Sequence, residues 1–540
     1  MGLTEANKNR IKNAIIPAVL ISLFMVLGFT SKHYKGIEHV GLLIGLFIAL
    51  CGVFLCVISC IYICFDKRKN KQIEKPSILS VKIEKSWVYF LISFVAILIL
   101  WLPTLLALYP GLYCYDASWQ YDTYMMGEVT EHHPVIHTYL IGFLIDSVHK
   151  LTGSFNKGIL AYTLVQMLIM GVGCAFVLYL LHRRKAPTWM HVFALLFFVA
   201  FPPFVIFVFT ATKDSIFAIA VADFLFINLF LIEDKKAFFD KKSNIVHWII
   251  LALTVCILRN NAIYALVITL PFFVYMLVKS DCNKKKALTM LLLTVFIYVI
   301  YKYPISKAVT VGGTSETEML SVPCQQIMRV YKYHYDELPS EYTEEVERFF
   351  DDKAWYGYYV PEIADATKGS LRKNLYETEK KEFFSLWLNL FELYPKEYVD
   401  SFLENTYGFY YPWPHYIIYS FGDEGYTPIV VMQPGELNSK LPGLLSFYKQ
   451  FENGPIVQKM PLISWLFAPA TFMYIALIMA FYMGGSVKRG YSVQFIFLGL
   501  LWLTYLLGPV AMVRYALYLY ALVPVWPAYL LSKRESINGI

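Results

Sequence analysis

Long apolar segments alternate with short polar ones along most of this 540-residue chain. A helix that crosses a bilayer needs about 20 mainly apolar residues. The segments 245–258 and 287–302 are shorter than that, and we include them because their neighbours on either side require a crossing. The pattern then predicts an all-α polytopic membrane protein with twelve spans, near residues 14–31, 40–64, 87–108, 157–181, 189–210, 215–232, 245–258, 262–279, 287–302, 460–483, 493–508 and 512–532.

One moderately apolar segment, 133–151, is not expected to span. It contains three histidines, an aspartate and a lysine. If it crossed the membrane, the basic sequence HRRK at 182–185 would move to the outer side. We predict an amphipathic or partly re-entrant helix on the outer face. His133 and His137 have the i, i+4 spacing of a metal-binding pair, but a polar helix face is the simpler interpretation.

Lysine and arginine set the expected orientation, because they concentrate in cytoplasmic loops. KRKNK at 67–71, HRRK at 182–185 and KKK at 284–286 all fall on one side of the predicted topology. We therefore expect both termini in the cytoplasm and the chain in a bacterial plasma membrane. The net charge of +7 then reports topology and predicts no nucleic-acid partner. A composition that is 57% hydrophobic and 16% charged excludes a typical cytosolic enzyme or a disordered chain.

The polar segments predict two large outer regions, 109–156 and 303–459. The second is long enough for a folded, mainly helical domain. Cys114 and Cys324 lie in these regions, and the sequence does not decide whether they form a disulfide. The predicted organisation is a two-span addition with a basic loop at 1–86, a membrane core at 87–302, an extracytoplasmic domain at 303–459 and C-terminal spans at 460–540.

Strongly polar residues at the predicted outer ends of the spans are the candidates for function, since ionisable groups at membrane depth are costly. They come from the first outer loop, from TATKDS at 210–215, from LRNNA at 258–262 and from GPVAMVRY at 508–515. We expect these regions to share one site. The candidates are Asp116, Gln120, Asp122, His132, His133, Lys213, Asp214, Arg259, Asn260, Asn261, Arg514 and Tyr515.

A carboxylate beside several cations suits group transfer from a lipid phosphate. Arginine matches phosphate oxygens with two parallel hydrogen bonds, and cations stabilise the charge of a departing phosphate. The carboxylate can take the proton of an acceptor hydroxyl. Structural roles remain open at this stage: Asp116 could cap a helix, Lys213 and Asp214 could form a simple ion pair, and Arg259 and Arg514 could anchor helix ends to lipid headgroups.

Several motifs together resemble a known class of membrane enzyme. They are YPG–D–Q–HHP at 109–134, KDS at 213–215, LRNN at 258–261, PxQQxxR at 323–329 and GP–RY at 508–515. The chain resembles the GT-C superfamily of glycosyltransferases, which use polyprenyl-phosphate sugars. It resembles more closely an uncharacterised bacterial membrane family, a domain of unknown function with GT-C-like architecture.

The resemblance implies a role for each candidate residue. Asp116 matches the loop carboxylate that acts as general base. Protein mannosyltransferases have adjacent acidic residues there, whereas Ala117 follows Asp116, so Asp122 is the second choice. Lys213, Arg259 and Arg514 would bind the donor phosphate, assisted by His132 or His133. Supporting substrate contacts would come from Gln120, Asp214, Asn260, Asn261, Tyr515, Gln325, Gln326 and Arg329.

The resulting hypothesis is a membrane glycosyltransferase. It would move a sugar, with inversion, from a polyprenyl-phosphate donor to an envelope glycan, lipid or protein on the outer face. The reaction needs no metal, although a Mg²⁺ or Mn²⁺ ion held by carboxylates is kept as an alternative. One alternative is a transporter or flippase of lipid-linked sugars, which internal repeats would favour, although this sequence shows no evident repeat. The other is a non-catalytic envelope scaffold.

Overall fold

The computed structural model describes residues 4–34, 36–72, 83, 85–113, 116–313, 316–351, 359–412, 437–453, 460–484 and 490–530. Within these ranges the protein is helical and has isolated β-bridges but no β-strands, which confirms the all-α prediction. Seven helices are long and apolar enough to cross a membrane. They are α1 (Glu5–Tyr34), α2 (Val40–Gln72), α4 (Ser86–Ala107), α7 (Phe155–Arg183), α10 (Lys213–Glu233), α13 (Asn260–Val278) and the continuous helical stretch Lys284–Val309, which begins with α14 (Lys284–Ile300).

The predicted number of twelve spans is not confirmed, because several segments are shorter or broken. The 189–210 segment divides into α8 (Thr188–Ala200) and α9 (Pro202–Val208), which meet at 60°. Pro202 and Pro203 cause the break, since proline disfavours helical geometry in the residue before it. Counting this pair as one span gives up to eight. Shorter apolar helices are α12 (Lys242–Leu258), α25 (Pro469–Gly484) and α26 (Tyr491–Leu506), followed by α27 (Val513–Ala521) and α28 (Trp526–Leu530).

Helix α10 is the centre of the bundle. Its most apolar stretch is 94% buried, and it packs against α7, α12, α26 and α27. A helix that is apolar on all sides is stable only when surrounded by protein or lipid. The Thr212 hydroxyl caps its N-terminus by accepting a hydrogen bond from Asp214 N at 3.3 Å. This geometry places Lys213 and Asp214, both buried, at the end of the bundle that we call the outer end, following the predicted orientation.

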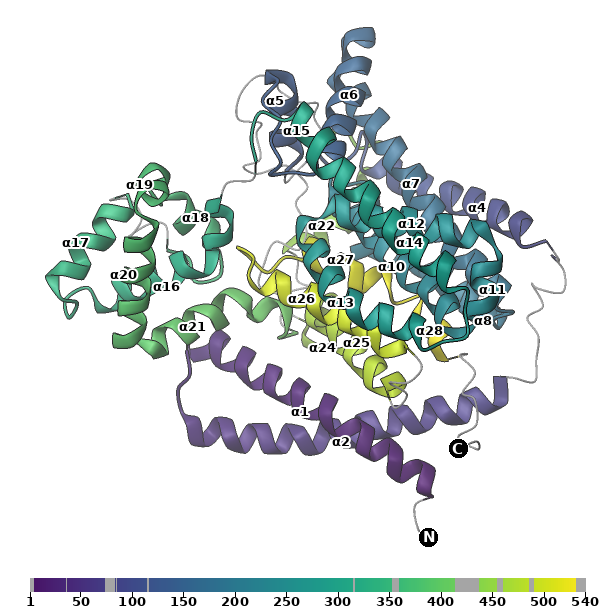
Figure 1. Ribbon diagram of the computed structural model, residues 1–540, viewed down its shortest axis with the longest axis horizontal. Coiled ribbons are helices and arrows are strands. Elements are labelled where there is room, and N and C mark those ends of the chain that lie inside the picture. Colours follow the sequence, from purple (N-terminus) through teal and green to yellow (C-terminus); the bar gives the residue numbers. More distant parts are fainter. Residues whose placement is uncertain are drawn as a thin grey trace.

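Two helices extend beyond the bundle at its outer end: α5 (Ala117–Met126) and α6 (Val135–Thr152) (Figure 1). Helix α6 covers most of the 133–151 segment and is not among the helices apolar enough to span. It packs against α5 and α7, and a Cβ on Gly158 of α7 would lie 2.6 Å from the Ile145 carbonyl oxygen. The α6–α7 pair therefore depends on a glycine contact.

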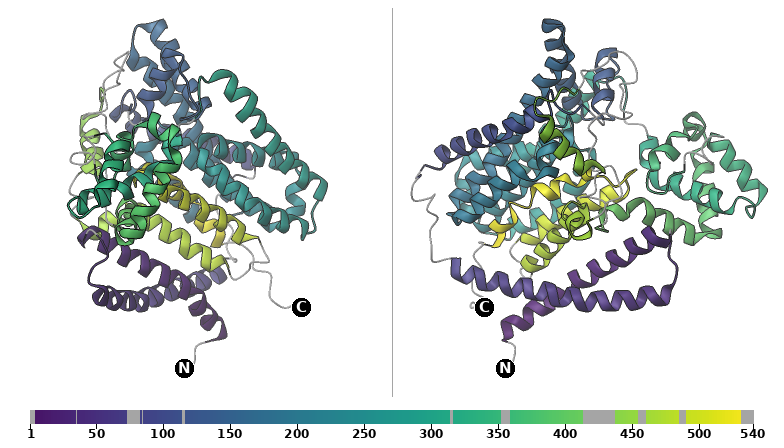
Figure 2. Two further views of the ribbon diagram at one scale, coloured as in Figure 1. Left: turned by 60° about the vertical axis from the view of Figure 1, so that its left-hand side comes forward. Right: turned by 180° about the vertical axis from the view of Figure 1, so that it is seen from behind.

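A separate helical unit, which we call the outer domain, lies beside the bundle (Figures 1 and 2). Its core joins α16 (Ser321–His334), α17 (Ser340–Phe349) and α20 (Lys380–Leu393), with the short α18 (Ala364–Gly369) and α19 (Lys373–Thr378) around them. Helix α21 (Pro395–Thr406) connects it to the bundle, continuing into the 3₁₀ turn Tyr407–Phe409. The later helix α22 (Pro442–Asn453) packs on α4 and α9 of the bundle.

The remaining short elements connect these units. They are α11 (Lys235–Asp240), the π-helix Tyr301–Ile305, α15 (Ser306–Val309), the 3₁₀ helix η2 (Glu316–Leu320) and α24 (Pro461–Trp465). Cys114 lies outside the described residues, whereas Cys324 is a buried free cysteine of α16.

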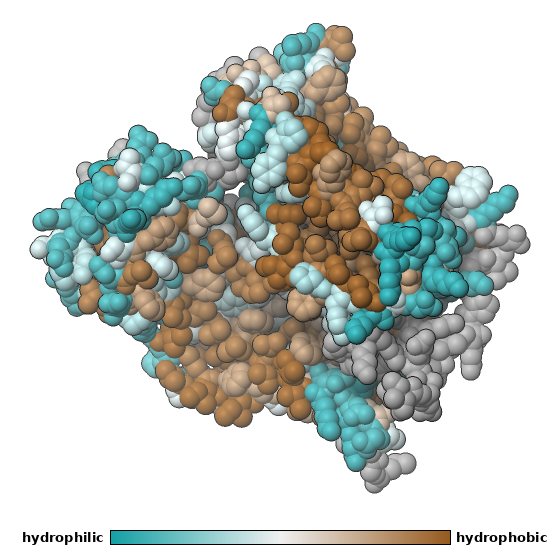
Figure 3. Space-filling view, viewed as in Figure 1, coloured by the Kyte–Doolittle hydropathy of each residue, from teal (hydrophilic) through white to brown (hydrophobic). Residues whose placement is uncertain are grey.

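The N-terminal helices α1 and α2 pair with each other along one side of the bundle, where α1 contacts α25 and α21 (Figure 2). Arg10 Nε donates to Asp66 Oδ2 at 2.6 Å and so ties their far ends together. Figure 3 shows a broad apolar surface over α12 and α14, between the hydrophilic outer domain and a hydrophilic area beside α11. This distribution is compatible with a multi-pass membrane protein.

The predicted orientation can be tested with single cysteines at exposed positions. We expect a membrane-impermeant maleimide to label Glu344→Cys in the outer domain of intact cells and to leave Lys236→Cys unlabelled until the cells are lysed. The unmodified chain gives the background from native cysteines. Labelling of only Lys236→Cys in intact cells would show that the topology is inverted.

The α6–α7 contact predicts a stability effect. Gly158→Ala should lower the stability by about 1–3 kcal/mol, because the new methyl group meets the backbone of α6, which cannot move aside locally. The matched control is Gly499→Ala in α26, where the added Cβ has no neighbour within 4 Å. Thermal unfolding of the purified variants measures the difference, and equal melting temperatures would contradict the packing.

Candidate functional site

A cavity of about 520 Å³, which we call the Asp116 cavity, lies at the outer end of α10. It lies between the membrane helices and the outer domain, and segments distant in the chain contribute to it. Its polar lining includes Asp116, His132, His133, Lys213, Arg259, Asn260, Asn261, Glu318, Asp365, Thr504, Tyr505, Arg514 and Tyr515. The structure therefore brings together most of the polar motifs that the sequence singled out.

Backbone pairing brings the first outer loop to the start of α10. Leu112 N donates to Phe209 O, and Ala211 N donates to Leu112 O, both at 2.8 Å. Gly111 precedes this pairing with φ +128°, and a Cβ there would collide with the Thr163 hydroxyl. The glycine of the YPG motif thus permits the close approach that places Asp116 beside Lys213.

Asp116 forms ion pairs with two cations at once. Lys213 Nζ lies 2.6 Å from Asp116 Oδ2, and Arg514 Nη1 lies 3.2 Å from Asp116 Oδ1. Burial alone raises the pKa of Asp116, but Arg514, Lys213 and His133 together lower it well below its usual range. The carboxyl group is therefore ionised at neutral pH. Asp116 also occupies the N-cap position of α5, although its side chain makes no capping hydrogen bond.

Asp214 is the second carboxylate of the cluster and is almost fully buried. Arg259 forms a short ion pair with its Oδ1 atom, and Arg514 Nε lies 4.0 Å from its Oδ2 atom. Arg514 therefore lies between the two carboxylates. The charges alternate from Lys213 through Asp116, Arg514 and Asp214 to Arg259, which is how a protein keeps several buried charges compensated.

Tyr515 fixes the two guanidinium groups. Its ring centroid lies 4.8 Å from Arg259 Cζ and 4.7 Å from Arg514 Cζ, and Arg514 Nη2 donates to its hydroxyl at 2.9 Å. Tyr505 stacks on Tyr515 with ring centroids 5.9 Å apart. Cations held over aromatic rings keep their charge and lose little mobility on binding a ligand. The arginines are thus pre-positioned for an anion.

The two histidines contribute differently. Lys213 Nζ lies 3.1 Å from His133 Nδ1, so a neutral His133 accepts a hydrogen bond from Lys213 at that nitrogen. Burial lowers the pKa of His133 well below its usual range, and Lys213 lowers it further. Burial also lowers the pKa of His132, whose ring centroid lies 4.5 Å from that of His133. Both side chains are neutral hydrogen-bonding groups at the cavity wall.

The two asparagines tie the cavity rim together. Asn261 Nδ2 donates to Thr504 Oγ1 at 2.8 Å and links α13 to α26. Asn260 Nδ2 donates to the Glu131 carbonyl at 3.4 Å and links α13 to the first outer loop. Both residues line the cavity while they hold its walls in position.

Gln120 and Asp122 do not line the cavity. Gln120 Oε1 lies 3.1 Å from His137 Nδ1, and Gln120 Nε2 donates to Thr138 at 3.0 Å. His137 Nε2 is hydrogen-bonded to the Tyr162 hydroxyl, which donates to Gln166. The Gln166 amide in turn donates to backbone carbonyls just before α10. Gln120 and His137 therefore position the loop rather than face a ligand. Asp122 is buried within α5, and burial raises its pKa.

The PxQQxxR motif lies in α16 and holds the outer domain together. Gln325 Nε2 donates to the Val360 carbonyl at 2.8 Å, and Gln326 Nε2 donates to the Tyr398 carbonyl at 3.1 Å. Arg329 forms ion pairs with Glu397, Glu404 and Asp400 of α21. None of the three motif residues lines the Asp116 cavity.

Two acidic residues complete the cavity and were not expected from the sequence: Glu318 of η2, which leads into the outer domain, and Asp365 of α18. Glu318 and Asp365 face it, and Lys368 binds their carboxylates at 2.6 and 3.1 Å. Nothing local distinguishes them from the many surface carboxylates of segment 303–459. The cavity therefore has a mainly cationic wall of membrane helices and an acidic wall from the outer domain.

Backbone contacts join the outer domain to the loop that precedes Arg514. Ala364 N donates to the Pro509 carbonyl at 2.7 Å, and Asn405 Nδ2 donates to the Gly508 carbonyl at 3.0 Å. No motif in the sequence singled out Asn405. The position of Arg514 consequently depends on how the outer domain is seated.

A metal site receives no support from the residues present. Within the described part of the chain no group of three or more His, Cys, Asp or Glu side chains could hold an ion. His133 and His137 have different partners, Lys213 and the Gln120–Tyr162 pair respectively.

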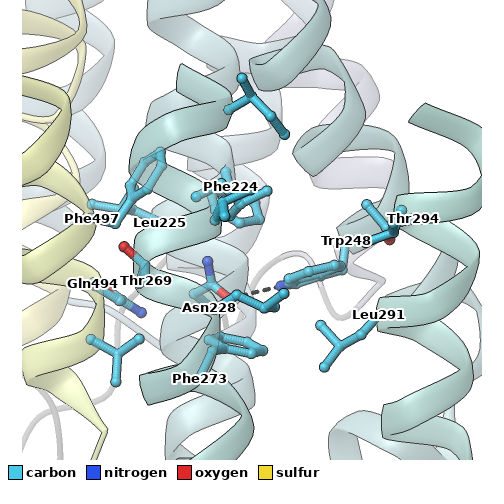
Figure 4. A pocket seen from close by; sticks show the side chains of 16 residues that line it. Phe224, Leu225, Asn228, Trp248, Thr269, Phe273, Leu291, Thr294, Gln494 and Phe497 are labelled. Carbon is cyan, nitrogen blue, oxygen red and sulfur yellow. Dashed lines mark hydrogen bonds between the residues drawn. The ribbon is translucent and has the colours of Figure 1, made fainter. Parts of the chain in front are cut away.

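An apolar pocket lies deeper in the bundle, among α10, α12, α13, α14 and α26 (Figure 4). Phe224, Leu270 and Phe497 are among its walls, and Trp248 Nε1 donates to Asn228 Oδ1 at 2.8 Å on one side. Helices α13 and α26 line both this pocket and the Asp116 cavity. The polar and apolar spaces thus follow one another along the same two helices.

Comparison with known proteins identifies a family. The model of DUF6020, a family of unknown function, matches residues 125–536. The chain belongs to this family. The match begins after Asp116 and includes the segments that contain His132, Lys213, Arg259 and Arg514. No curated protein and no solved structure matches the chain.

Ion pairing of Asp116 predicts a pH dependence. Its pKa is lower in the folded protein than in the unfolded chain, so its ion pairs stabilise the fold above about pH 4 and the effect is lost as the pH falls through the folded pKa. We expect Asp116→Asn to melt several degrees below the wild type at pH 7, with the difference in melting temperature becoming smaller as the pH falls below about 4. Glu344→Gln, an exposed site on α17, should show no difference at either end of this pH range.

Proposed function

We propose that this protein is a membrane glycosyltransferase of GT-C type. It transfers a sugar from a polyprenyl-phosphate donor to a cell-envelope acceptor at the outer face of a bacterial plasma membrane. The donor phosphate binds at the cationic wall of the Asp116 cavity. The acceptor, a glycan, lipid or protein, approaches from the side of the outer domain.

One observation carries the proposal: cations from three separate chain segments line one cavity together with the Asp116 carboxylate at the outer end of the bundle. Lys213 of α10 and Arg514 of α27 both contact Asp116, and Arg259 reaches the same cavity through Asp214. Two arginine forks and a lysine suit the phosphodiester of such a donor and the phosphate monoester that leaves it, because their N–H groups match the phosphate oxygens. A simple structural ion pair would not need three cations around an open cavity.

The chemistry follows from these positions. An acceptor hydroxyl oxygen attacks the anomeric carbon of the donor sugar, and its proton passes to Asp116. The bond between that carbon and the phosphate oxygen breaks with its electron pair leaving on the phosphate. Lys213, Arg259 and Arg514 stabilise the charge that develops there. In the unliganded state Arg514 and Lys213 lower the pKa of Asp116, so a phosphate that binds them offsets their charge and makes Asp116 a stronger base.

The apolar pocket supports a lipid-linked donor. Ile263 lines the pocket and its neighbour Tyr264 lines the cavity, and Leu270 of the pocket lies about 9 Å further along α13. A substrate with a charged head and an apolar chain needs a polar cavity that is followed by an apolar pocket. A soluble sugar nucleotide would use only the polar part.

A transporter of lipid-linked sugars is the second candidate. The observation that favours it is the broken pair α8–α9, bent by 60° beside α27, since broken helices are common in transporters. Reconstituted vesicles separate the two functions: a transporter moves the intact lipid-linked sugar across the bilayer, whereas a transferase releases polyprenyl phosphate and a glycosylated acceptor.

The central test is the activity of Asp116→Asn. Purified protein with a radiolabelled polyprenyl-phosphate sugar should release or transfer the sugar, and the variant should be slower by about 10²–10⁴-fold, as for removal of a general base. Asp122→Asn is the matched control: the residue lies outside the cavity, so we expect near wild-type rates. Full activity in Asp116→Asn, with an unchanged elution profile, would exclude Asp116 as the base.

A further inference from the structure

A second polar pocket lies at the opposite end of the bundle from Asp116. Its volume is about 330 Å³, and it lies between the start of α4, the ends of α7 and α10, and the start of α12. Phe230 of α10 lines it and lies about 25 Å along the helix from Lys213. We call it the basal pocket, lined by Ser86, Trp87, Phe176, Tyr179, Leu180, Arg183, Ile227, Phe230, Lys241, Ser243, Asn244 and His247.

The charges of the basal pocket are all of one sign. Arg183 and Lys241 line it and no carboxylate does. Neither cation forms an ion pair within the described residues, whereas the adjacent Arg184 binds Glu233, with Nη2 at 2.8 Å from Oε1. A concave site with cations and no carboxylate attracts an anion.

The Arg183 guanidinium is held in position by aromatic rings. Its Cζ atom lies 5.7 Å from the Tyr179 ring centroid and 5.2 Å from that of Phe230. A cation over an aromatic face keeps its hydrogen-bond donors for a ligand. Ser243, in the first turn of α12, also lines the pocket and adds a hydroxyl group, whereas the Asn244 backbone N–H donates to the Lys241 carbonyl at 3.1 Å.

An exposed apolar edge adjoins the basal pocket. Trp87 at its edge is 59% exposed, and Leu91 of α4 and Ile250 of α12, about one turn further along each helix, are also exposed. Tryptophan at a helix end is typical of the membrane–water interface. A free phosphate ion would use only the cations, whereas a phospholipid would use the cations and this apolar edge together.

We propose that the basal pocket binds the phosphate headgroup of an anionic phospholipid. The phosphate lies between Arg183 and Lys241 at the start of α12, and the acyl chains run along α4 and α12. In the predicted orientation this is the cytoplasmic leaflet, whose anionic lipids attract basic pockets between helices. The site is independent of the proposed transfer reaction, so either can fail without the other.

Native mass spectrometry of the full chain tests this site with phosphatidylglycerol and phosphatidylcholine as probes. We expect phosphatidylglycerol to bind more tightly. Each removed cation should weaken its binding about fivefold, and Arg183→Gln with Lys241→Gln together about 30-fold, since each cation near a membrane surface contributes about 1 kcal/mol. Phosphatidylcholine binding should not change.

The matched control is Lys236→Gln with Lys242→Gln, which removes the same charge from neighbouring positions outside the pocket lining. This control should bind phosphatidylglycerol like the wild type. Lys241 is exposed, so Lys241→Gln alone gives a well-folded variant if the double variant does not fold. Equal binding of both lipids to the wild type, or equal loss in the control, would overturn the proposal. Displacement of phosphatidylglycerol by millimolar inorganic phosphate would overturn the lipid as the source of the phosphate.

Discussion

The buried charges around the N-terminus of α10 are the constraint on which the rest of the structure depends. Lys213 and Asp214 are buried at the end of the central helix, where isolated charges would be very costly. Their partners Asp116, Arg259 and Arg514 come from other hairpins. The first outer loop, the α12–α13 turn and the last helices must therefore all reach this point. Loss of one partner leaves an uncompensated charge, at a cost of about 3–5 kcal/mol for a buried pair.

The outer domain is coupled to this charge cluster through α21. Arg329 of the outer-domain core forms an ion pair with Glu404 of α21. One residue further on, Asn405 binds the Gly508 carbonyl in the loop before Arg514. Burial raises the pKa of Glu404 to about 7, with Arg329 opposing the shift. The acidic and cationic walls of the cavity are therefore held together through α21, in addition to the hydrogen bond from Ala364 N of α18 to the Pro509 carbonyl.

The two ends of the bundle and the region between them differ in chemistry in a way that fits a lipid substrate. The Asp116 cavity offers cations and a carboxylate at one end, and the pocket of Figure 4 offers apolar side chains inside the bundle. The basal pocket offers cations at the opposite end. A lipid phosphate reacting at one end and a lipid phosphate bound at the other would use the same arginine chemistry for different purposes.

Sequence determined what depends on local chemistry. The apolar segments gave α1, α2, α4, α7, α10 and α13, because twenty apolar residues in series favour a helix in a membrane. The same segments placed polar motifs at helix ends, and these included Asp116, Lys213, Arg259 and Arg514. Tertiary structure decided which polar residues meet. Asp122 is buried in α5, Gln120 supports a loop and Arg329 pairs with α21, whereas Glu318 and Asp365 join the cavity. Those contacts link residues from separate elements, such as Gln120 with Thr138 and Arg329 with Glu404, and no local pattern in the chain records them.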